Sequence, residues 1–161
     1  MKKALLAVLV LSMAFGVMTA AAQTPQKPLT LRYAHMNPPN SPNALQAQYF
    51  ADKIAEKTKG AIKIMVYPSS QLGSITEMAE AVAMGTVALH HNTYGGLQPL
   101  LEELGLFDTP FLYRDVNHLL AATDPVTSPV LKELNAKLIA TRNVRILYSF
   151  YFGTRDLTCN K

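Results

Sequence analysis

The 161-residue sequence is poor in residues that would cross-link the chain or give it a strong charge. It holds one cysteine, Cys159, so an internal disulfide framework is excluded and a packed core must stabilise the fold. Charged residues make up 16% of the chain, and its net charge of +4 includes no block of five or more basic residues. This weak and scattered charge argues against a nucleic-acid-binding protein.

Common signatures of catalysis and nucleotide binding are also missing. The sequence has no G-x-S-x-G nucleophile elbow and no G-x-G-x-x-G or G-K-[ST] phosphate loop, so Gly95-Gly96 is interpreted as a turn. Of the four histidines, His35, His90, His91 and His118, the adjacent pair would point to opposite faces of a strand and chelate one ion poorly. We therefore expect no enzyme, no metal site and no cofactor.

The N-terminal residues have the three-part layout of a secretory signal peptide. Two lysines follow Met1, residues 4–18 form an uncharged apolar run, and Ala20-Ala21-Ala22 provides small residues for cleavage. The run is too short for a comfortable membrane span, and no cysteine follows it to carry a lipid. We predict a signal peptide over residues 1–22, a flexible leader over residues 23–28, and export to the periplasm.

Strand and helix patterns alternate in the next part of the chain. Residues 29–35 and 61–67 alternate apolar and polar side chains, and residues 86–91 form a third, short strand pattern. Between these strands, Ser41 before Pro42 and Ser74 three residues before Glu77 are signals of helix N-termini. The order predicts an α/β fold with a mainly parallel sheet, in which ligands bind beyond the carboxyl ends of the strands.

The remaining residues give weaker patterns. We expect a helical turn over residues 97–104, an inward-packed aromatic loop over residues 107–115, and helices after Asp115 and Ser128. Residues 145–152 are rich in β-branched and aromatic side chains and predict a strand.

Arg155 follows this predicted strand in a loop that begins at Gly153. A guanidinium presents a planar fork that suits a carboxylate at two points. From the residues alone, a salt bridge to Asp156 or a surface role is as good an interpretation as ligand binding.

Several motifs occur in an order that is typical of one receptor family. They are LRYAHMNPPNSP, YFADKIAEKTKG, IKIMVYPSSQLGS, EMAEAVAMGTV, LFDTPFLYRD and FYFGTRDLTCNK. With them, the sequence from Leu29 to Lys161 resembles the dicarboxylate-type extracytoplasmic solute receptors of tripartite ATP-independent periplasmic (TRAP) transporters. One departure is Ala88, where such receptors commonly carry an acidic residue.

The resemblance implies one lobe of a type II periplasmic-binding-protein fold, with the second lobe missing. It divides the chain into an N-terminal lobe over residues 29–143 and a crossing strand with the start of the second lobe over residues 144–161. It implies binding of an organic carboxylate and delivery to membrane permease subunits. The ligand-binding residues that it implies are Arg155, His35, Met36, Gln71, Asn92, Thr93 and Tyr94. Two alternatives stay open: a receptor of an ATP-driven importer, and a secreted hydrolase or metal protein.

Overall fold

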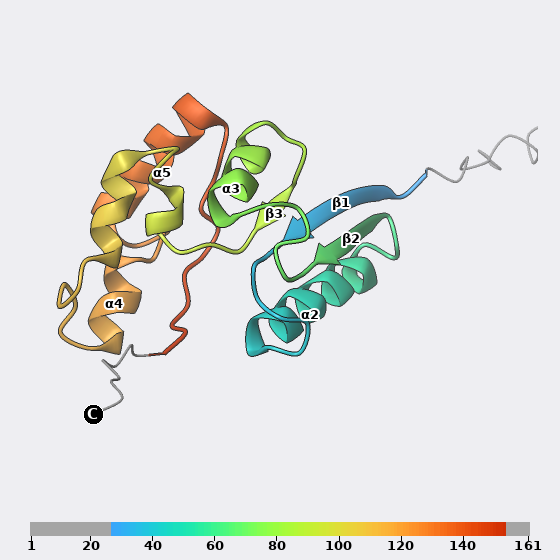
Figure 1. Ribbon diagram of the computed structural model, residues 1–161, viewed down its shortest axis with the longest axis horizontal. Helices are drawn as coiled ribbons and strands as arrows, with labels where there is room; N and C mark the ends of the chain where they lie inside the picture. The colour runs from blue at the N-terminus through green and yellow to red at the C-terminus, as the bar shows by residue number, and fades with distance from the viewer. Residues whose placement is uncertain (1–26, 154–161) are drawn as a thin grey trace, which may run out of the picture.

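A small parallel sheet forms the centre of the fold (Figure 1). In the computed structural model, which describes residues 27–153, the strands β1 (Leu29–Ala34), β2 (Ile62–Tyr67) and β3 (Leu89–His90) lie in the order β2-β1-β3. All six residues of β1 pair with β2, from Leu29 opposite Ile62 to Ala34 opposite Tyr67. The expected parallel α/β architecture is confirmed, and the carboxyl ends of the three strands meet at one edge of the sheet.

Helices α2 (Pro42–Lys57) and α3 (Ile75–Ala83) begin where the sequence predicts. The Ser41 hydroxyl accepts a hydrogen bond from the backbone N–H of Ala44, and Pro42 occupies the first turn. Ser74 and Glu77 form a complete capping box, since each side chain accepts the backbone N–H of the other residue. These local bonds set the entry point of each helix beside the sheet.

The two helices cover opposite faces of the sheet (Figure 1). Tyr33 and Ile64 pack with Ala47 and Ala51 of α2. Ala34, the next residue of β1, packs instead with Met78 of α3 and with Val87. Successive residues of β1 thus face opposite layers, as the alternation of its side chains predicts.

The second half of the chain is helical. It consists of two 3-10 helices, η1 (Gly95–Leu97) and η2 (Glu102–Asp108), and two α-helices, α4 (Val116–Ala122) and α5 (Pro129–Arg142). Asp115 and Ser128 cap the α-helices as expected, because each side chain accepts a backbone N–H of the first turn. A buried cluster joins this half to α3, and its members are Ala79, Leu100, Leu101, Leu104, Leu131, Leu138 and Val144.

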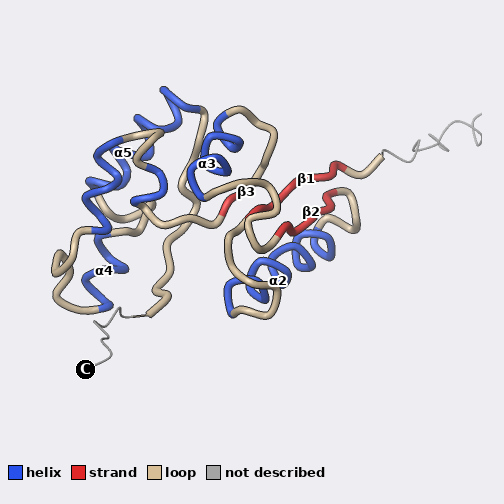
Figure 2. Tube along the Cα trace, in the orientation of Figure 1, coloured by secondary structure: helices blue, strands red, loops and turns tan. Residues whose placement is uncertain are grey.

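The strand predicted over residues 145–152 is absent from the structure, and the prediction is wrong for these residues. Figure 2 shows the segment that follows α5 as a loop. The backbone of Ile146 bonds to the side chain of Asn135 in α5: its N–H donates to Oδ1 at 2.9 Å and its carbonyl accepts from Nδ2 at 3.0 Å. A side-chain amide thus takes the place that a neighbouring strand would fill.

Three smaller predictions need correction. The third strand spans two residues rather than residues 86–91, because only Tyr33 and Ala34 of β1 pair with it. The helical turn expected over residues 97–104 is divided between the 3-10 helices η1 and η2. Phe111 does not pack inward: it lies in the left-handed backbone region with a fully exposed ring.

Some predictions fall outside the described residues. The signal peptide over residues 1–22 and Arg155 are among them. Within residues 27–153, no helix combines the length and the apolar character needed to cross a membrane.

Candidate functional site

The loop after β1 and the turn after β2 lie side by side at the carboxyl edge of the sheet. His35, the residue after β1, donates its backbone N–H to the carbonyl of Tyr67 at 3.0 Å and accepts from Ser70 N at 3.1 Å. One step further, Ser69 N donates to the carbonyl of Asn37 at 3.0 Å. Ser69 and Ser70 both adopt positive φ angles, which turns the chain sharply enough to make these bonds. The Met36 loop and the Gln71 turn therefore form one rim.

The end of β3 joins this rim through the carbonyl of Ala34. That oxygen accepts the backbone N–H of His91 at 3.2 Å and lies 2.9 Å from Nδ1 of His90. Because a carbonyl only accepts, Nδ1 of His90 carries the proton in this bond. The two histidines thus point to different neighbours, as expected for adjacent residues of a strand, and both stay next to β1.

Unpaired polar atoms gather at this edge. Among the described residues, six side-chain nitrogen and oxygen atoms are buried without a hydrogen-bond partner in the protein, and all lie on four residues. They are Nδ1 and Nε2 of His35, Nε2 of His90, Nδ1 of His91, and Nδ2 and Oδ1 of Asn92. A buried unpaired polar group costs about 1–3 kcal/mol, so their concentration in one place marks a site prepared for a polar ligand.

Glycine helps to orient one of these groups. The amide of Asn92 lies against Gly96 so closely that a Cβ atom there would come within 2.0 Å of Oδ1. A larger residue at position 96 would therefore displace the Asn92 side chain. The neighbouring Thr93 accepts the Gly96 N–H at 3.2 Å and keeps the turn closed.

The histidines of the site favour their neutral forms. Burial, together with the charges of His35 and His90, lowers the pKa of His91 to about 4. Burial also lowers the pKa values of His35 and His90, although the nearby backbone of Asn37 and of Ala34 acts against the shift. Because the charge of His90 lowers the pKa of His35, and the charges of both lower the pKa of His91, the three histidines share one electrostatic environment. We refer to His35, His90 and His91 as the histidine cluster.

The segment after α5, residues 144–153, crosses this edge. The ring of Phe150 meets the ring of His91 edge-on, with centroids 4.9 Å apart. Tyr148 lies close enough to Tyr33 to add to the rise in the Tyr33 pKa that burial causes. Between them, the Ser149 hydroxyl donates to the carbonyl of Thr123 at 2.7 Å. Side chains of the crossing segment therefore alternate between the sheet edge and the helical half.

The predicted site residues fall into two groups by position. His35 is fully buried in the cluster, and Asn92 lies beside it, whereas Met36, Gln71 and Thr93 are exposed on the surrounding loops.

Tyr94 and Arg155 stand apart from both groups. The ring of Tyr94 stacks on Phe107 with centroids 4.9 Å apart, and its hydroxyl bonds to Ser149 and to the Thr123 carbonyl. That hydroxyl is therefore engaged within the protein. Arg155 lies outside the described residues, so its ligand role stays a prediction.

Sequence reasoning missed His91 as a member of the site. It expected residues 91–96 at the edge where ligands bind in parallel sheets, but it weighed the His91 side chain itself only as a metal ligand. That position was the signal that could have identified it. Among the described residues, no group of three or more histidine, cysteine or acidic side chains has a geometry that would hold a metal ion.

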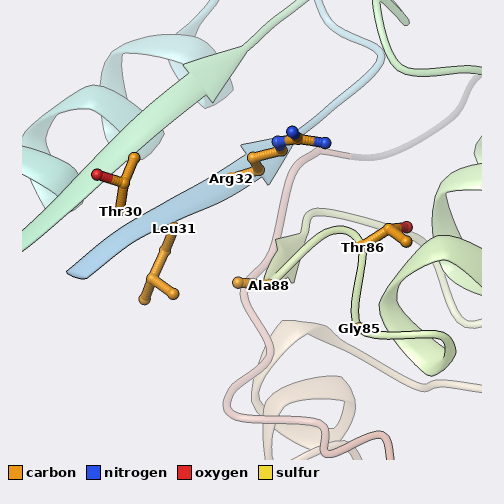
Figure 3. A pocket seen from close by; sticks show the side chains of 6 residues that line it. All are labelled: Thr30, Leu31, Arg32, Gly85, Thr86 and Ala88. Carbon is orange, nitrogen blue, oxygen red and sulfur yellow. The ribbon is translucent and has the colours of Figure 1, made fainter.

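A hollow lies beside the first half of β1, away from the candidate site (Figure 3). It is lined by Thr30, Leu31, Arg32, Gly85, Thr86 and Ala88. Figure 3 shows the side chains of Thr30 and Arg32 on one side of β1 and that of Leu31 on the other, so the polar groups do not converge. The hollow arises because β3 pairs only with Tyr33 and Ala34 and leaves the start of β1 uncovered on this side.

Comparison with known proteins identifies the family that the chain matches. Residues 33–161 match the family described as bacterial extracellular solute-binding protein, family 7. The 2,3-diketo-L-gulonate-binding periplasmic protein YiaO of Escherichia coli is 30% identical over 148 residues, which cover 90% of this chain and 41% of that protein.

Solved structures show the same relationship. A TRAP periplasmic solute-binding protein from Rhodobacter sphaeroides is 28% identical with a TM-score of 0.63, over 73% of this chain and 37% of that one. A protein of the same kind from Sulfurospirillum deleyianum, with bound succinate, is 27% identical with a TM-score of 0.59, over 70% and 35% of the two chains. The chain thus spans well under half the length of these relatives. It belongs to the bacterial extracellular solute-binding protein family 7, the receptor family that its sequence resembles.

Proposed function

We propose that this chain is the ligand-contacting N-terminal part of a periplasmic receptor that binds an organic carboxylate and delivers it to the membrane permease of a TRAP transporter. The observation that carries the proposal is the concentration of unpaired polar atoms at the carboxyl edge of the sheet, on His35, His90, His91 and Asn92. Membership of a solute-binding receptor family supports it. So do the names of two relatives, one bound to succinate and one named for binding 2,3-diketo-L-gulonate, since both ligands are organic acids.

Binding would use closure of two lobes around the ligand. The relatives are much longer than this chain, and their additional length would supply the opposite wall of the cleft. The crossing segment, residues 144–153, leaves the sheet edge next to His91 and would form part of the hinge. A ligand that contacts both walls stabilises the closed state by its differential affinity for that state.

In this proposal, each predicted residue has a distinct part. His35 and Asn92 contact the ligand at the base of the cleft, while Met36, Gln71 and Thr93 line its rim. Arg155 holds a ligand carboxylate at two points, and Tyr94 supports the site through its bonds to Ser149 and Thr123. The role requires no catalytic residue and no cofactor. The signal peptide would be cleaved after Ala22 and leave the receptor in the periplasm.

The alternatives receive less support. An ATP-driven importer would use a similar fold, but the matched family and the similar solved structures are of the TRAP type. A secreted hydrolase or metal protein would belong to a different class from the solute-binding receptors that this chain resembles.

Ligand titrations followed by nuclear magnetic resonance test the proposal on this chain. Succinate and galacturonate are added at millimolar concentration to the isotope-labelled protein, with glutamine and phosphate as comparison ligands. We expect saturable shifts for the organic acids at residues 35–37 and 91–93, and none for the comparison ligands. The Arg155→Lys variant should bind the acids more weakly, because lysine cannot reproduce the planar two-point contact.

Two results would contradict the proposal. One is the absence of saturable shifts for every organic acid while the spectrum remains that of a folded protein. The other is an equal response to glutamine or phosphate, which would favour the receptor of an ATP-driven importer.

A further inference from the structure

One histidine of the cluster, His90, has no hydrogen-bond donor left for a carboxylate while its ring is neutral. A carboxylate is an acceptor only, and a neutral imidazole has a single N–H. In His90 that N–H is on Nδ1, and it already donates a hydrogen bond to the carbonyl of Ala34 at 2.9 Å. Its unpaired Nε2 is then a bare acceptor in the neutral ring. A carboxylate placed at the cluster would meet a lone pair at this atom unless a proton is added.

The surroundings of the cluster supply little negative charge. From β1, the ring of Tyr33 meets His35 edge-on with centroids 6.3 Å apart, and its phenol stays neutral because burial raises its pKa. From the start of α3, the backbone of Ile75 is the group that acts on His90. From the crossing segment, the aromatic ring of Phe150 covers His91. The charges that act on His35 and His91 are those of other histidines.

Two acidic side chains of the helical half act on other groups. Asp108 of η2 accepts the backbone N–H of Gly95 at 2.7 Å, and Asp124 accepts the N–H of Val126 at 2.7 Å. Both carboxylates influence the pKa of Tyr94, on the far side of the turn that follows β3. They are not among the groups that shift the histidines. Within residues 27–153, no carboxylate is among the groups that shift these histidines, so an anion that enters the cluster would be its first negative partner from outside this part of the chain.

We propose that the histidine cluster binds a carboxylate group of the ligand together with one proton from solvent, so that ligand binding strengthens as the pH falls. This inference rests on the proposed function, since it concerns how the same site recognises its ligand. The proton adds an N–H to the cluster and forms an imidazolium, and the ligand carboxylate remains ionised beside it. Charge balance is kept because one positive and one negative charge enter the site together.

His91 is the member of the cluster through which a ligand reaches this site. It is half-buried, whereas His35 is fully buried, and its cover is a ring from the crossing segment rather than from the sheet. A bond from a protonated imidazole to a carboxylate is charge-assisted and is stronger than a neutral one in a site shielded from water. Loss of His91 should therefore remove proton coupling without removing every ligand contact.

The test measures affinity against pH with the full chain and succinate as the probe. Titrations are followed through the histidine ring proton signals between about pH 5 and pH 8, the range in which an imidazole changes charge. Uptake of one proton makes the dissociation constant rise by up to about tenfold per pH unit as the pH increases. Binding should also move the ring signals of His91 toward those of an imidazolium.

Two matched controls separate the cluster from other effects. His118→Gln removes the remaining histidine, which lies on α4, and should leave the pH dependence unchanged. Succinamide has the shape of succinate without its charge and should show no proton-coupled binding. In His91→Gln, the pH dependence of succinate binding should be lost while the far-ultraviolet circular dichroism stays that of the unaltered chain.

Each result has a distinct meaning. Saturable succinate binding with the same affinity at every pH, in both the unaltered chain and His91→Gln, overturns the inference and leaves the proposed function in place. A pH dependence that survives in His91→Gln also overturns the assignment to His91. The absence of binding by any organic acid across the pH range overturns the proposed function, and the inference falls with it.

Discussion

Asn135 of α5 and Ile146 of the crossing segment hold each other by two hydrogen bonds. The Asn135 side chain accepts from Ile146 N at 2.9 Å and donates to the Ile146 carbonyl at 3.0 Å. Asn135 is buried, so its amide has little access to water. The pair fixes the direction in which the segment leaves α5, four residues before Phe150 covers His91. Its geometry thus connects a helix of the second half to the candidate site.

Removal of this amide should destabilise the chain. Asn135→Ala leaves the N–H and the carbonyl of Ile146 without their partners, and each lost bond contributes about 0.5–1.5 kcal/mol, so we expect a loss of about 1–3 kcal/mol in the free energy of unfolding. Urea denaturation followed by circular dichroism measures it. Asn117→Ala, at an exposed position of α4, is the matched control. Equal stability of the two variants would show that the Asn135 bonds are dispensable.

The capping box of α3 should make stability depend on pH. Bonds from the backbone and side chain of Ser74 hold the pKa of Glu77 below its ordinary value of 4.5. Because the folded pKa is lowered, the stabilisation is present above the ordinary pKa and is lost as the pH falls below about 4.5 toward the folded value. Glu77→Gln should therefore flatten the acid limb of the stability profile in urea titrations.

Ser74→Ala removes the other half of the same capping box. It should cost about 1 kcal/mol of stability at neutral pH, as is typical for the loss of an N-cap side chain. Glu80→Gln is the control for Glu77→Gln, since Glu80 is exposed on the same helix and its carboxylate takes no part in the capping box. A Glu77→Gln variant that keeps the acid sensitivity of the unaltered chain would contradict the assignment.

The histidine cluster should destabilise the chain in mild acid. Burial lowers the pKa of His91 to about 4 from its ordinary 6.5, so the unfolded chain takes up a proton at this residue before the folded chain does. Stability from this group is complete above pH 6.5 and falls as the pH drops from 6.5 toward 4. His91→Gln should therefore lose less stability than the unaltered chain between neutral pH and pH 5, as measured by urea midpoints. Parallel curves for the two proteins would refute this prediction.

Local chemistry made much of the fold predictable. The caps at Ser74, Asp115 and Ser128 each depend on a bond to the first turn of the helix that follows, so a few adjacent residues contain the whole signal. The alternation in β1 likewise reports that successive residues face opposite layers, and the capped helices between the strands indicated a parallel sheet. The carboxyl edge followed from that topology, and the resemblance to the receptor family named His35 and Asn92 as ligand-binding residues there.

Features that depend on distant partners were not predictable. The β-prone residues 145–152 needed a neighbouring strand, and the bonds of Ile146 went to Asn135 instead, which no local pattern reveals. The exposure of Phe111 follows from a positive φ angle that aromatic residues rarely adopt. The contact between His91 and Phe150 depends on the fold that brings the crossing segment to the sheet edge. These relations belong to tertiary packing and not to sequence spacing.

The chain should associate with itself at high concentration. Strand β2 ends the order of the sheet, so its outer edge has no strand partner among the described residues, and β3 leaves the start of β1 uncovered. An open strand edge pairs readily with a second chain. Exposed apolar side chains add to this tendency, and Phe111, Met84 and Val126 are the most exposed of them. We expect the weight-average mass in light scattering to rise with concentration.

Substitutions on the edge and on the loop separate the two contributions to this association. Met65→Lys places a charge on the free strand β2, and Phe111→Ser removes the most exposed ring, so each should shift the equilibrium toward monomer. Leu45→Ser is the control, because Leu45 is an exposed apolar residue on α2, away from both features. All samples contain a reductant, which prevents a disulfide between two copies of Cys159. A monomeric unaltered chain at every concentration, or an equal effect of Leu45→Ser, would show that the strand edge and Phe111 do not drive association.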